Sequence, residues 1–401
     1  MVMEQPLQLK FLLVKKMNKT TKPRILFVDD EKNIIDGLTR MLRPYRYEWE
    51  MFFVLSGQEA LEFMQHTNID LLITDMRMPQ MNGAELLQIV QEKYPQVIRV
   101  VLSGHSDENL IIESVKTAHQ FLAKPCTAEA LIDTILKMLL MRDNIQDDAL
   151  IKIINGVEEL PSAPEMIIKL DGELNSKNIS LKNISHIISE DVSLSAKMLQ
   201  MVNSAYFGLP SKIADLDNAV SILGVNTIKS LILFLKLNNG NYPIPATFSL
   251  DELWHHSLSV AKASQLIFEY EMGPSPLGRE VYAAGLLHDM GKLVLLKYPG
   301  YIENFLLPGS KEIADKEYEK LSISHAEVGA YLLGLWNLPN HISDAVAMHH
   351  KPEAISTFGL PAAVCFANLL INDINEQKIA AKAGVFSDKI EKWKTLVQNL
   401  L

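Results

Sequence analysis

The chain has 401 residues, of which 48% are hydrophobic and 21% charged, and its formal net charge is -10. This length predicts two or three domains, and the composition is that of a globular protein. The acidic charge, without a dense run of Lys and Arg, disfavours nucleic acid as a partner of the bulk surface. The two cysteines, Cys126 and Cys365, cannot make a disulfide framework, which favours a reducing compartment.

Residues 1–22 are expected to be a flexible lead-in to the first domain. Their longest apolar run is FLLV at 11–14. That run is too short for the core of a signal peptide and far too short for a membrane span. We therefore expect no membrane association and a cytoplasmic location.

Residues 23–142 alternate short apolar runs with amphipathic ones. Strands are predicted at 24–28, 50–55, 70–74, 97–102 and 120–123, and helices at 31–42, 58–66, 83–94, 108–117 and 128–142. Continuous apolar strands that alternate with helices are typical of a parallel sheet with helices on both faces. This part of the chain is therefore predicted to be a doubly wound (βα)5 domain.

The polar, acidic stretch at 143–150 is the predicted linker. From 151 to 401, apolar residues recur at the helical spacing, and alternating strand patterns are almost absent. Long helices are predicted at 179–191, 193–207, 217–237, 253–270 and 325–336. The whole chain is thus predicted to be an α/β domain followed by an all-α domain.

Polar side chains stand at or just after the ends of the predicted strands: Asp29, Asp30, Asp75, Ser103 and Lys124. Ligands of such sheets bind beyond the carboxyl ends of the strands. Clustered carboxylates repel one another, and a hard divalent cation such as Mg²⁺ relieves that repulsion. Read one at a time, Asp29 and Asp30 could cap a helix and Lys124 could be a solvated loop lysine. Together they indicate a site where Asp75 takes up a phosphoryl group.

Four motifs resemble the receiver domain of two-component response regulators: VDDE (28–31), ITDMRMPQMNG (73–83), VLSGH (101–105) and AKP (123–125). The resemblance covers about residues 23–142. It implies that a sensor histidine kinase or a phosphotransfer protein phosphorylates Asp75. It also implies the remaining roles: Asp29, Asp30 and Asp75 hold Mg²⁺, Ser103 is the switch hydroxyl, Phe121 is the switching aromatic residue, and Lys124 contacts the phosphoryl group.

The helical part contains six histidines that are candidate metal ligands: His255, His256, His288, His325, His349 and His350. A lone histidine on an apolar helix is usually a core residue or a helix cap. Several histidines and an aspartate on separate helices favour a metal site, because helical bundles build such sites from side chains on facing helices. Imidazole and carboxylate ligands suit Zn, Fe, Mn or Ni.

LLHDMGK (286–292), WHHSLSVA (254–261), SHAEVGAYLL (324–333) and MHHKPE (348–353) resemble the HD superfamily of metal-dependent phosphohydrolases. The resemblance implies the ligands: His256 first, His288 and Asp289 as the central pair, then His325, His349 and His350. It implies that Lys292 contacts phosphate, and Glu252 would suit an extra metal. Asn368 stands where that family has its last aspartate, and a neutral amide is a weaker ligand and a poorer aid to water activation.

A second resemblance, to the HD-related output domain (HDOD), covers about residues 150–400. LPSAPEMIIKL (160–170), ISEDVSLSAKMLQMVNSAYFG (188–208) and DNAVSILGV (217–225) carry it. It implies a mostly non-catalytic domain with degraded metal ligands, whereas this chain retains most of them. Two functions therefore stay open: a module that signals to a protein partner, and a receiver-gated phosphohydrolase of a nucleotide or phosphoester. No DNA-reading helix-turn-helix is recognisable, so no nucleic-acid partner is expected, and a homodimer is expected.

Overall fold

The structure is a computed structural model, and it describes residues 22–400 apart from 104–116, 144, 146, 158–159, 163, 177, 205–206, 208, 210, 239–247, 306–312, 373–378 and 380. The predicted lead-in, except for Lys22, and nearly all of the helix predicted at 108–117 lie outside the described residues. The chain forms two compact units, Met1–Glu158 with Ser204–Gly208, and Glu159–Asn203 with Leu209–Leu401.

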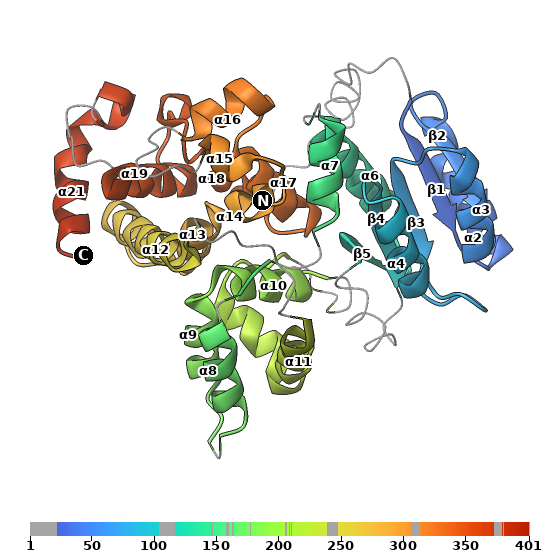
Figure 1. The fold of residues 1–401 in the computed structure, drawn as a ribbon, viewed down its shortest axis with the longest axis horizontal. Coiled ribbons are helices and arrows are strands. Elements are labelled where there is room, and N and C mark those ends of the chain that lie inside the picture. The colour runs from blue at the N-terminus through green and yellow to red at the C-terminus, as the bar shows by residue number, and fades with distance from the viewer. Residues whose placement is uncertain are drawn as a thin grey trace. The chain divides into compact units, whose positions relative to one another are not determined.

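The first unit is built on a five-stranded parallel sheet (Figure 1). Its strands are β1 Arg24–Val28, β2 Glu50–Val54, β3 Leu71–Asp75, β4 Ile98–Ser103 and β5 Gln120–Ala123, in the order β2-β1-β3-β4-β5. Every neighbouring pair is parallel, so the carboxyl ends of the strands meet at one edge. The predicted doubly wound α/β fold is confirmed.

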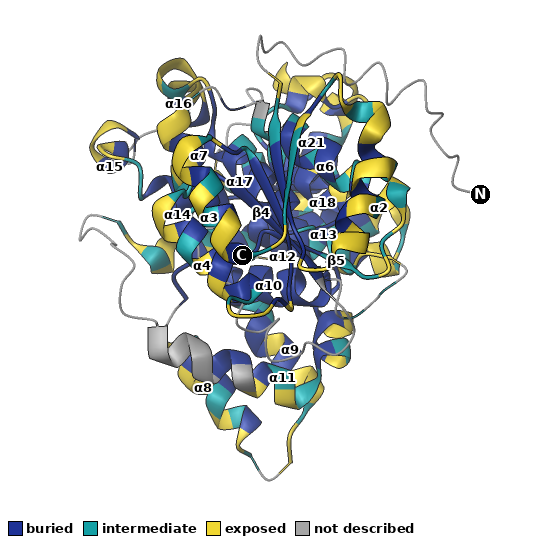
Figure 2. Ribbon diagram, turned by 90° about the vertical axis from the view of Figure 1, so that its right-hand side faces the viewer, coloured by how far each residue is buried: buried dark blue, intermediate teal, exposed yellow. Residues whose placement is uncertain are grey.

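Helices accompany the sheet: α2 Lys32–Leu42, η1 Arg43–Tyr45, α3 Gly57–His66, α4 Gly83–Lys93, α6 Ala128–Asp143 and α7 Asp148–Asn155. Two of these helices begin at capping residues. Ser56 caps α3 by accepting the backbone N–H of Glu59, and Asn82 and Glu85 form a reciprocal capping box at the start of α4. Figure 2 shows buried strands between helices whose outward faces are exposed, the layering that a parallel sheet requires.

Helix α7 is tied to the sheet by a buried polar network. The guanidinium of Arg99, on β4, donates from Nη2 to the carbonyl of Asn155 over 2.7 Å. His119 Nδ1 accepts the backbone N–H of Arg99, so its Nε2 carries the proton and donates to the same carbonyl over 2.9 Å. The Asn155 amide donates to the carbonyl of Gln96. The predicted linker at 143–150 thus overlaps a helix that packs with the first unit.

The described part of the second unit consists of helices, as predicted. They are α8 Pro164–Leu174, α9 Leu181–Ser189, α10 Val192–Val202, α11 Leu216–Asn238, α12 Leu250–Met272, α13 Pro276–Leu287, α14 Met290–Leu295, α15 Tyr301–Phe305, α16 Ile313–Leu321, α17 His325–Leu335, α18 Asn340–Met348, η3 Pro352–Ala354, α19 Leu360–Asn372, η4 Gly384–Lys389 and α21 Ile390–Gln398. Helix α11 is interrupted at Gly224, whose φ of 71° is a conformation that glycine adopts without strain. The single helix predicted at 217–237 is therefore two helical segments.

The core of the second unit lies among six helices. Helix α12 packs against α13 and α19, α17 packs against α14 and α18, and α18 also contacts α13 and α19. These helices carry the candidate ligands on their inward faces, so the packing that forms the core also forms the site. None of the helices in the described ranges has both the length and the apolar character needed to cross a bilayer.

Candidate functional site

The carboxyl edge of the sheet brings together Asp29, Asp75 and Lys124. Asp29 follows β1, Asp75 ends β3 and Lys124 follows β5. The Lys124 ammonium lies 2.7 Å from Asp29 Oδ2 and also forms an ion pair with Asp75 Oδ1. The second oxygen of each carboxylate accepts a backbone N–H over 3.0 Å, from Glu31 for Asp29 and from Arg77 for Asp75. We call this group the phosphoacceptor edge.

Burial and charge act in opposite directions at this edge. Burial raises the pKa of Asp75, the Asp29 carboxylate raises it further, and Lys124 offsets only part of this rise. Burial alone would lower the pKa of Lys124, but hydrogen bonds and Coulomb attraction from both carboxylates raise it. Two buried carboxylates that share one ammonium retain excess negative charge, and a divalent cation would neutralise it.

The other three residues predicted for this site, Asp30, Ser103 and Phe121, differ from one another in their position relative to the strands of the sheet. Asp30 is exposed, whereas Phe121 is buried on β5. Ser103 ends β4 in register with Ala123. The three aspartates do not form a set of ligand atoms within 4.8 Å of one another among the described residues, and the Lys124 ammonium lies between two of them. Their roles as Mg²⁺ ligands and switch residues remain predictions.

The second unit brings the predicted histidines together around one carboxylate. Two sets of potential ligand atoms lie within 4.8 Å of one another and share Asp289: one with His325, His349 and His350, the other with His256 and His288. The residues come from α12, the end of α13, the start of α14, the start of α17 and the end of α18. We call these six residues the histidine centre.

Imidazole nitrogens surround the Asp289 carboxylate. The Nε2 atoms lie at 3.1 Å for His325, 3.4 Å for His288, and 3.6 Å for both His349 and His256. Lys292 Nζ contacts Asp289 Oδ2 at 2.6 Å. All these groups except His256 and Lys292 are almost completely excluded from solvent. A carboxylate and several imidazoles are therefore held within bonding reach of one point.

Hydrogen bonds at the opposite ring nitrogens orient the histidines. His288 Nδ1 donates to the carbonyl of Gly285 over 2.7 Å, and His349 Nδ1 donates to the carbonyl of Val346 over 2.6 Å. Because a carbonyl only accepts, each Nδ1 carries the proton. In this tautomer the Nε2 lone pairs of both rings point to the centre, as in histidines that bind metals.

Glu317, on α16, orients His325 in the same way, and the sequence analysis did not identify it. It is fully buried, and its Oε2 accepts both the backbone N–H and the Nδ1–H of His325, each over 2.7 Å. Its Oε1 accepts the hydroxyl of Tyr301. The sequence offered one signal: Glu317 lies three residues after Ala314, so the two side chains share a face of a short helix. In the structure both residues of that face are buried.

The pKa shifts of two histidines and of Asp289 suit a cation, whereas the pKa of His325 is raised because Glu317 outweighs the effect of burial. Burial lowers the pKa of His349 to about 3 and that of His256 to about 4, so both rings are neutral near pH 7. Burial alone would raise the pKa of Asp289, but His288 and Lys292 hold it well below its usual range. Among the described residues, Asp289 Oδ1 and His349 Nε2 are buried without a hydrogen-bond partner. Buried atoms of this kind are costly unless something binds them, so the donor set fits a transition metal.

Gly291, in the HDMGK stretch, lets the backbones of α14 and α17 touch. A Cβ at this position would lie 1.9 Å from the His325 carbonyl oxygen and 2.8 Å from the Gly329 nitrogen. Only glycine permits this approach. The contact places Asp289, which caps α14, beside His325, the first residue of α17.

The remaining predicted residues divide into two groups. Asn368 lies at the centre: its Oδ1 is 3.1 Å from His256 Nε2 and accepts the Asn372 amide over 2.7 Å. Glu252 and His255 are exposed on α12 and belong to neither ligand set. The ligand sets found among the described residues therefore do not support an extra metal at Glu252.

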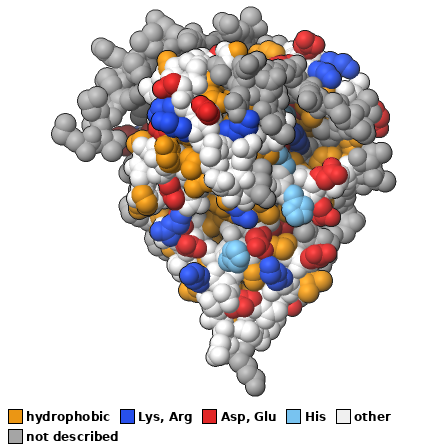
Figure 3. Space-filling view, turned by 90° about the vertical axis from the view of Figure 1, so that its left-hand side faces the viewer, with side chains coloured by type: hydrophobic (Ala, Val, Ile, Leu, Met, Phe, Trp, Pro, Cys, Tyr) orange, Lys and Arg blue, Asp and Glu red, His pale blue; other side chains and the backbone are white. Residues whose placement is uncertain are grey.

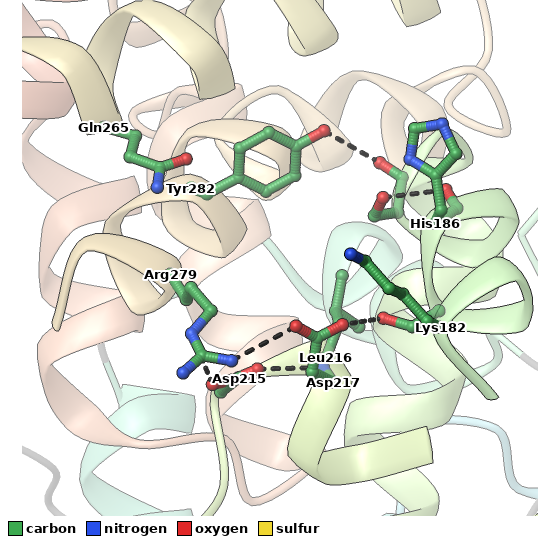
Figure 4. Close-up of a pocket in the computed structure, with 10 residues that line it drawn as sticks. Lys182, His186, Asp215, Leu216, Asp217, Gln265, Arg279 and Tyr282 are labelled. Atoms are coloured by element: carbon green, nitrogen blue, oxygen red, sulfur yellow. Dashed lines mark hydrogen bonds and ion pairs between the residues drawn. The ribbon is translucent and has the colours of Figure 1, made fainter. Parts of the chain in front are cut away.

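A separate pocket of about 270 Å³ lies among α9, α12, α13 and the start of α11 (Figure 4). Several of its polar groups pair with one another. Arg279 pairs with Asp215 and Asp217, each over 3.1 Å, Asp217 also accepts the Ser185 hydroxyl, and Tyr282 donates to the carbonyl of Ser189. This arrangement joins two groups of helices, and we interpret it as structural.

Comparisons with known proteins agree with both halves of the fold. The response regulator receiver domain matches residues 25–136, and the HDOD domain matches residues 160–352. Together with the sheet and its phosphoacceptor edge, these matches define a two-component response regulator. Its output part belongs to the HDOD family, so the chain joins an N-terminal receiver domain to a C-terminal HDOD domain.

Individual relatives are distant. An uncharacterized protein of Treponema pallidum (strain Nichols) is 26% identical over 232 residues, which is 55% of this chain and 43% of that protein. The hydrogenase transcriptional regulatory protein HoxA of Cupriavidus necator is 35% identical over 113 residues, 28% of this chain and 23% of HoxA. The chain thus spans less than half the length of these curated relatives. A virulence factor of Campylobacter jejuni subsp. jejuni shares the fold, with 19% identity and a TM-score of 0.50 over 61% of this chain and 92% of that one.

Proposed function

We propose that a sensor histidine kinase or a phosphotransfer protein phosphorylates Asp75, with Mg²⁺ held by Asp29, Asp30 and Asp75. The observation that best supports this proposal is the position of Lys124, whose ammonium contacts both buried carboxylates. There it can bind the oxygens of an incoming phosphoryl group. Mg²⁺, when bound, would supply further positive charge to that group.

The proposed response is a charge switch. The phosphoryl group adds negative charge and acceptor oxygens, which draw in the Ser103 hydroxyl. Phe121, buried on β5, then takes a new rotamer in the space that is vacated. Helix α6 follows β5 directly and carries the change along the chain.

The output proposed for this change is protein–protein signalling through the HDOD domain, by a homodimer and to a partner protein. The HDOD match over 160–352 supports it. If the coupling is correct, phosphorylation alters sedimentation behaviour or the hydrogen exchange of residues 128–160. If neither changes, the coupling proposal is wrong.

Labelling with acetyl phosphate tests the phosphoacceptor. Wild-type protein with Mg²⁺ should incorporate phosphate, and Asp75→Asn should not. Asp36→Asn is a matched control because Asp36 is exposed on α2 and is not one of the carboxylates of the phosphoacceptor edge. Equal labelling of Asp75→Asn and wild type would show that the assignment is incorrect.

A second function, metal-dependent phosphohydrolysis gated by the receiver, is favoured by one specific observation. Asp289 Oδ1 and His349 Nε2 are buried, and no residue in the described part of the chain forms a hydrogen bond with either atom. The histidine centre would hold Fe, Mn or Zn, and the metal would supply an activated water. The residues of the chain would then bind and orient: Glu317 holds His325, and Lys292 is placed to attract a phosphate of a nucleotide or phosphoester. Asn368, a neutral residue, weakens the case for catalysis.

Metal analysis of the untagged full chain tests this second function. One or two transition-metal ions per chain are expected, and His288→Ala should remove them. His255→Ala is the control, because His255 is exposed and lies outside both ligand sets. A folded wild-type protein that contains no transition metal would leave protein–protein signalling as the function of the helical domain.

A further inference from the structure

A groove of about 780 Å³ lies beside the edge strand of the receiver sheet, and neither proposed function uses it. Five basic residues line it: Lys22, Arg24, Arg40, Arg43 and Arg46. The single acidic residue in its lining is Glu50, which is already paired with Arg24 over 2.8 Å. We call it the basic groove.

The charge of this groove contrasts with the rest of the chain. Residues 22–142 contain 13 Lys or Arg and 17 Asp or Glu, and five of those 13 cations line this one feature. On the face drawn in Figure 3, by comparison, the described basic and acidic side chains are interspersed. Like charges gathered in a concave surface repel one another and attract anions, so the groove is suited to a negatively charged ligand.

The groove is distinct from the phosphoacceptor edge. Arg24 and Glu50 are register partners at the amino ends of β1 and β2, whereas Asp29 follows the carboxyl end of β1. Five residues of strand separate Arg24 from Asp29, roughly 16 Å at the usual rise. A ligand in the groove would therefore leave Asp75 accessible.

The floor of the groove is partly apolar. Met51 and Phe53 are two residues apart on β2, so both point to the same face of the sheet, and both are only partly buried. Trp49 also lines the groove, and its indole N–H is buried without a hydrogen-bond partner among the described residues. The groove therefore combines basic side chains with an apolar surface formed by Trp49, Met51 and Phe53.

From these features we infer that the basic groove binds a nucleoside polyphosphate. Arginine guanidinium groups recognise phosphate oxygens in a bidentate manner, and Arg40 and Arg43, three residues apart and exposed, present two such groups on one side. Met51 and Phe53 offer an apolar surface for the base. The volume lies within the range of small-molecule sites, about 300–1,000 Å³. The chain's own residues 1–21 are an unsuitable occupant, because they carry four Lys and one Glu.

Calorimetric titration of the full chain with ATP and GTP in EDTA tests this inference. Chelation removes Mg²⁺ and transition metals, so binding does not depend on the phosphoacceptor edge or on a metal at the histidine centre. Nucleotide binding should weaken by about tenfold or more in Arg40→Gln/Arg43→Gln, since two charge-assisted contacts are lost. Lys93→Gln/Lys392→Gln removes two exposed charges that do not line the groove and should change the affinity by no more than about twofold, because solvent and salt screen exposed charges.

Titrations with inorganic phosphate and with adenosine test whether the groove recognises the phosphates, the base or both. Inorganic phosphate and adenosine should each bind much more weakly than ATP if the groove recognises both phosphate and base. Hydrogen exchange of residues 38–54 in the wild-type protein should slow with ATP, which tests the location without any substitution. No nucleotide binding, equal binding of inorganic phosphate, equal loss in both double variants, or selective binding of an oligoglutamate peptide would each overturn the inference.

Discussion

Glu317 offers the sharpest test of the histidine centre, because it holds a ligand without touching the proposed metal. Replacing it by glutamine keeps the shape and removes only the charge. An amide oxygen in the position of Oε2 can still accept the two N–H groups of His325, and the amide nitrogen can donate to Tyr301. The packing of the site should therefore survive the substitution.

The magnitude follows from the two contacts of 2.7 Å to His325. A hydrogen bond to a charged group contributes about 1.5–3 kcal/mol and a neutral one about 0.5–1.5 kcal/mol. Glu317→Gln converts two hydrogen bonds to a charged acceptor into hydrogen bonds to a neutral one. The free energy of unfolding should therefore fall by about 2–3 kcal/mol. Loss of an orienting partner also weakens metal affinity, by about 10–100-fold.

Urea denaturation and competition with a metal chelator measure these two quantities on the full chain. Glu319→Gln is the matched control, since Glu319 lies two residues away on α16 and is exposed. It should leave both quantities unchanged. If Glu317→Gln binds metal as tightly as the control, Glu317 does not position His325, and the reasoning from hydrogen-bonded tautomers is wrong.

Three further predictions concern the packing and the buried network. Gly291→Ala should destabilise the second unit by about 3 kcal/mol and abolish metal binding, because the added Cβ meets a carbonyl at 1.9 Å. Gly172→Ala, in a helix with open space around it, should instead stabilise by about 0.5–1 kcal/mol, and thermal unfolding distinguishes the two. Arg279→Ala should cost only about 1 kcal/mol in urea denaturation, because its side chain is 50% exposed; a loss several times larger would contradict this. Burial and Arg99 hold the pKa of His119 well below its usual value of 6.5, so the unfolded chain takes up a proton that the folded chain excludes. Stability should therefore fall below pH 6.5 by up to about 1.4 kcal/mol per pH unit from this group, and an unchanged pH slope in His119→Gln would contradict it.

The sequence predicts the sheet and its edge well for a physical reason. Buried parallel strands are continuous apolar runs, and the polar residue that ends each run, such as Asp29 or Asp75, marks the carboxyl edge. The histidine centre is likewise predictable, because histidines and an aspartate on separate helices have few other reasons to converge. Gly224 was missed as a break, since one glycine in an apolar run is compatible with a helix.

Residues that act through tertiary hydrogen bonds were harder to predict. Glu317 lies eight positions before His325, a spacing with no helical or strand meaning, and only the packing of α16 against α17 brings them together. The position of α7 depends on a backbone carbonyl, at Asn155, which accepts from Arg99 and His119. A carbonyl occurs at every residue, so no sequence pattern indicates which one is bound.

The attachment of α7 has a consequence for building hybrid regulators. The helix begins within the acidic stretch that composition suggests as a linker, yet its last carbonyl is bound to β4 and its contacts are with the receiver. A receiver cut after Asp143 would leave the Arg99 guanidinium and the His119 ring without that acceptor. A foreign output domain should therefore be fused after Gly156. Fusions at the two positions, differing by 13 residues of receiver, should differ in solubility and in resistance to proteolysis.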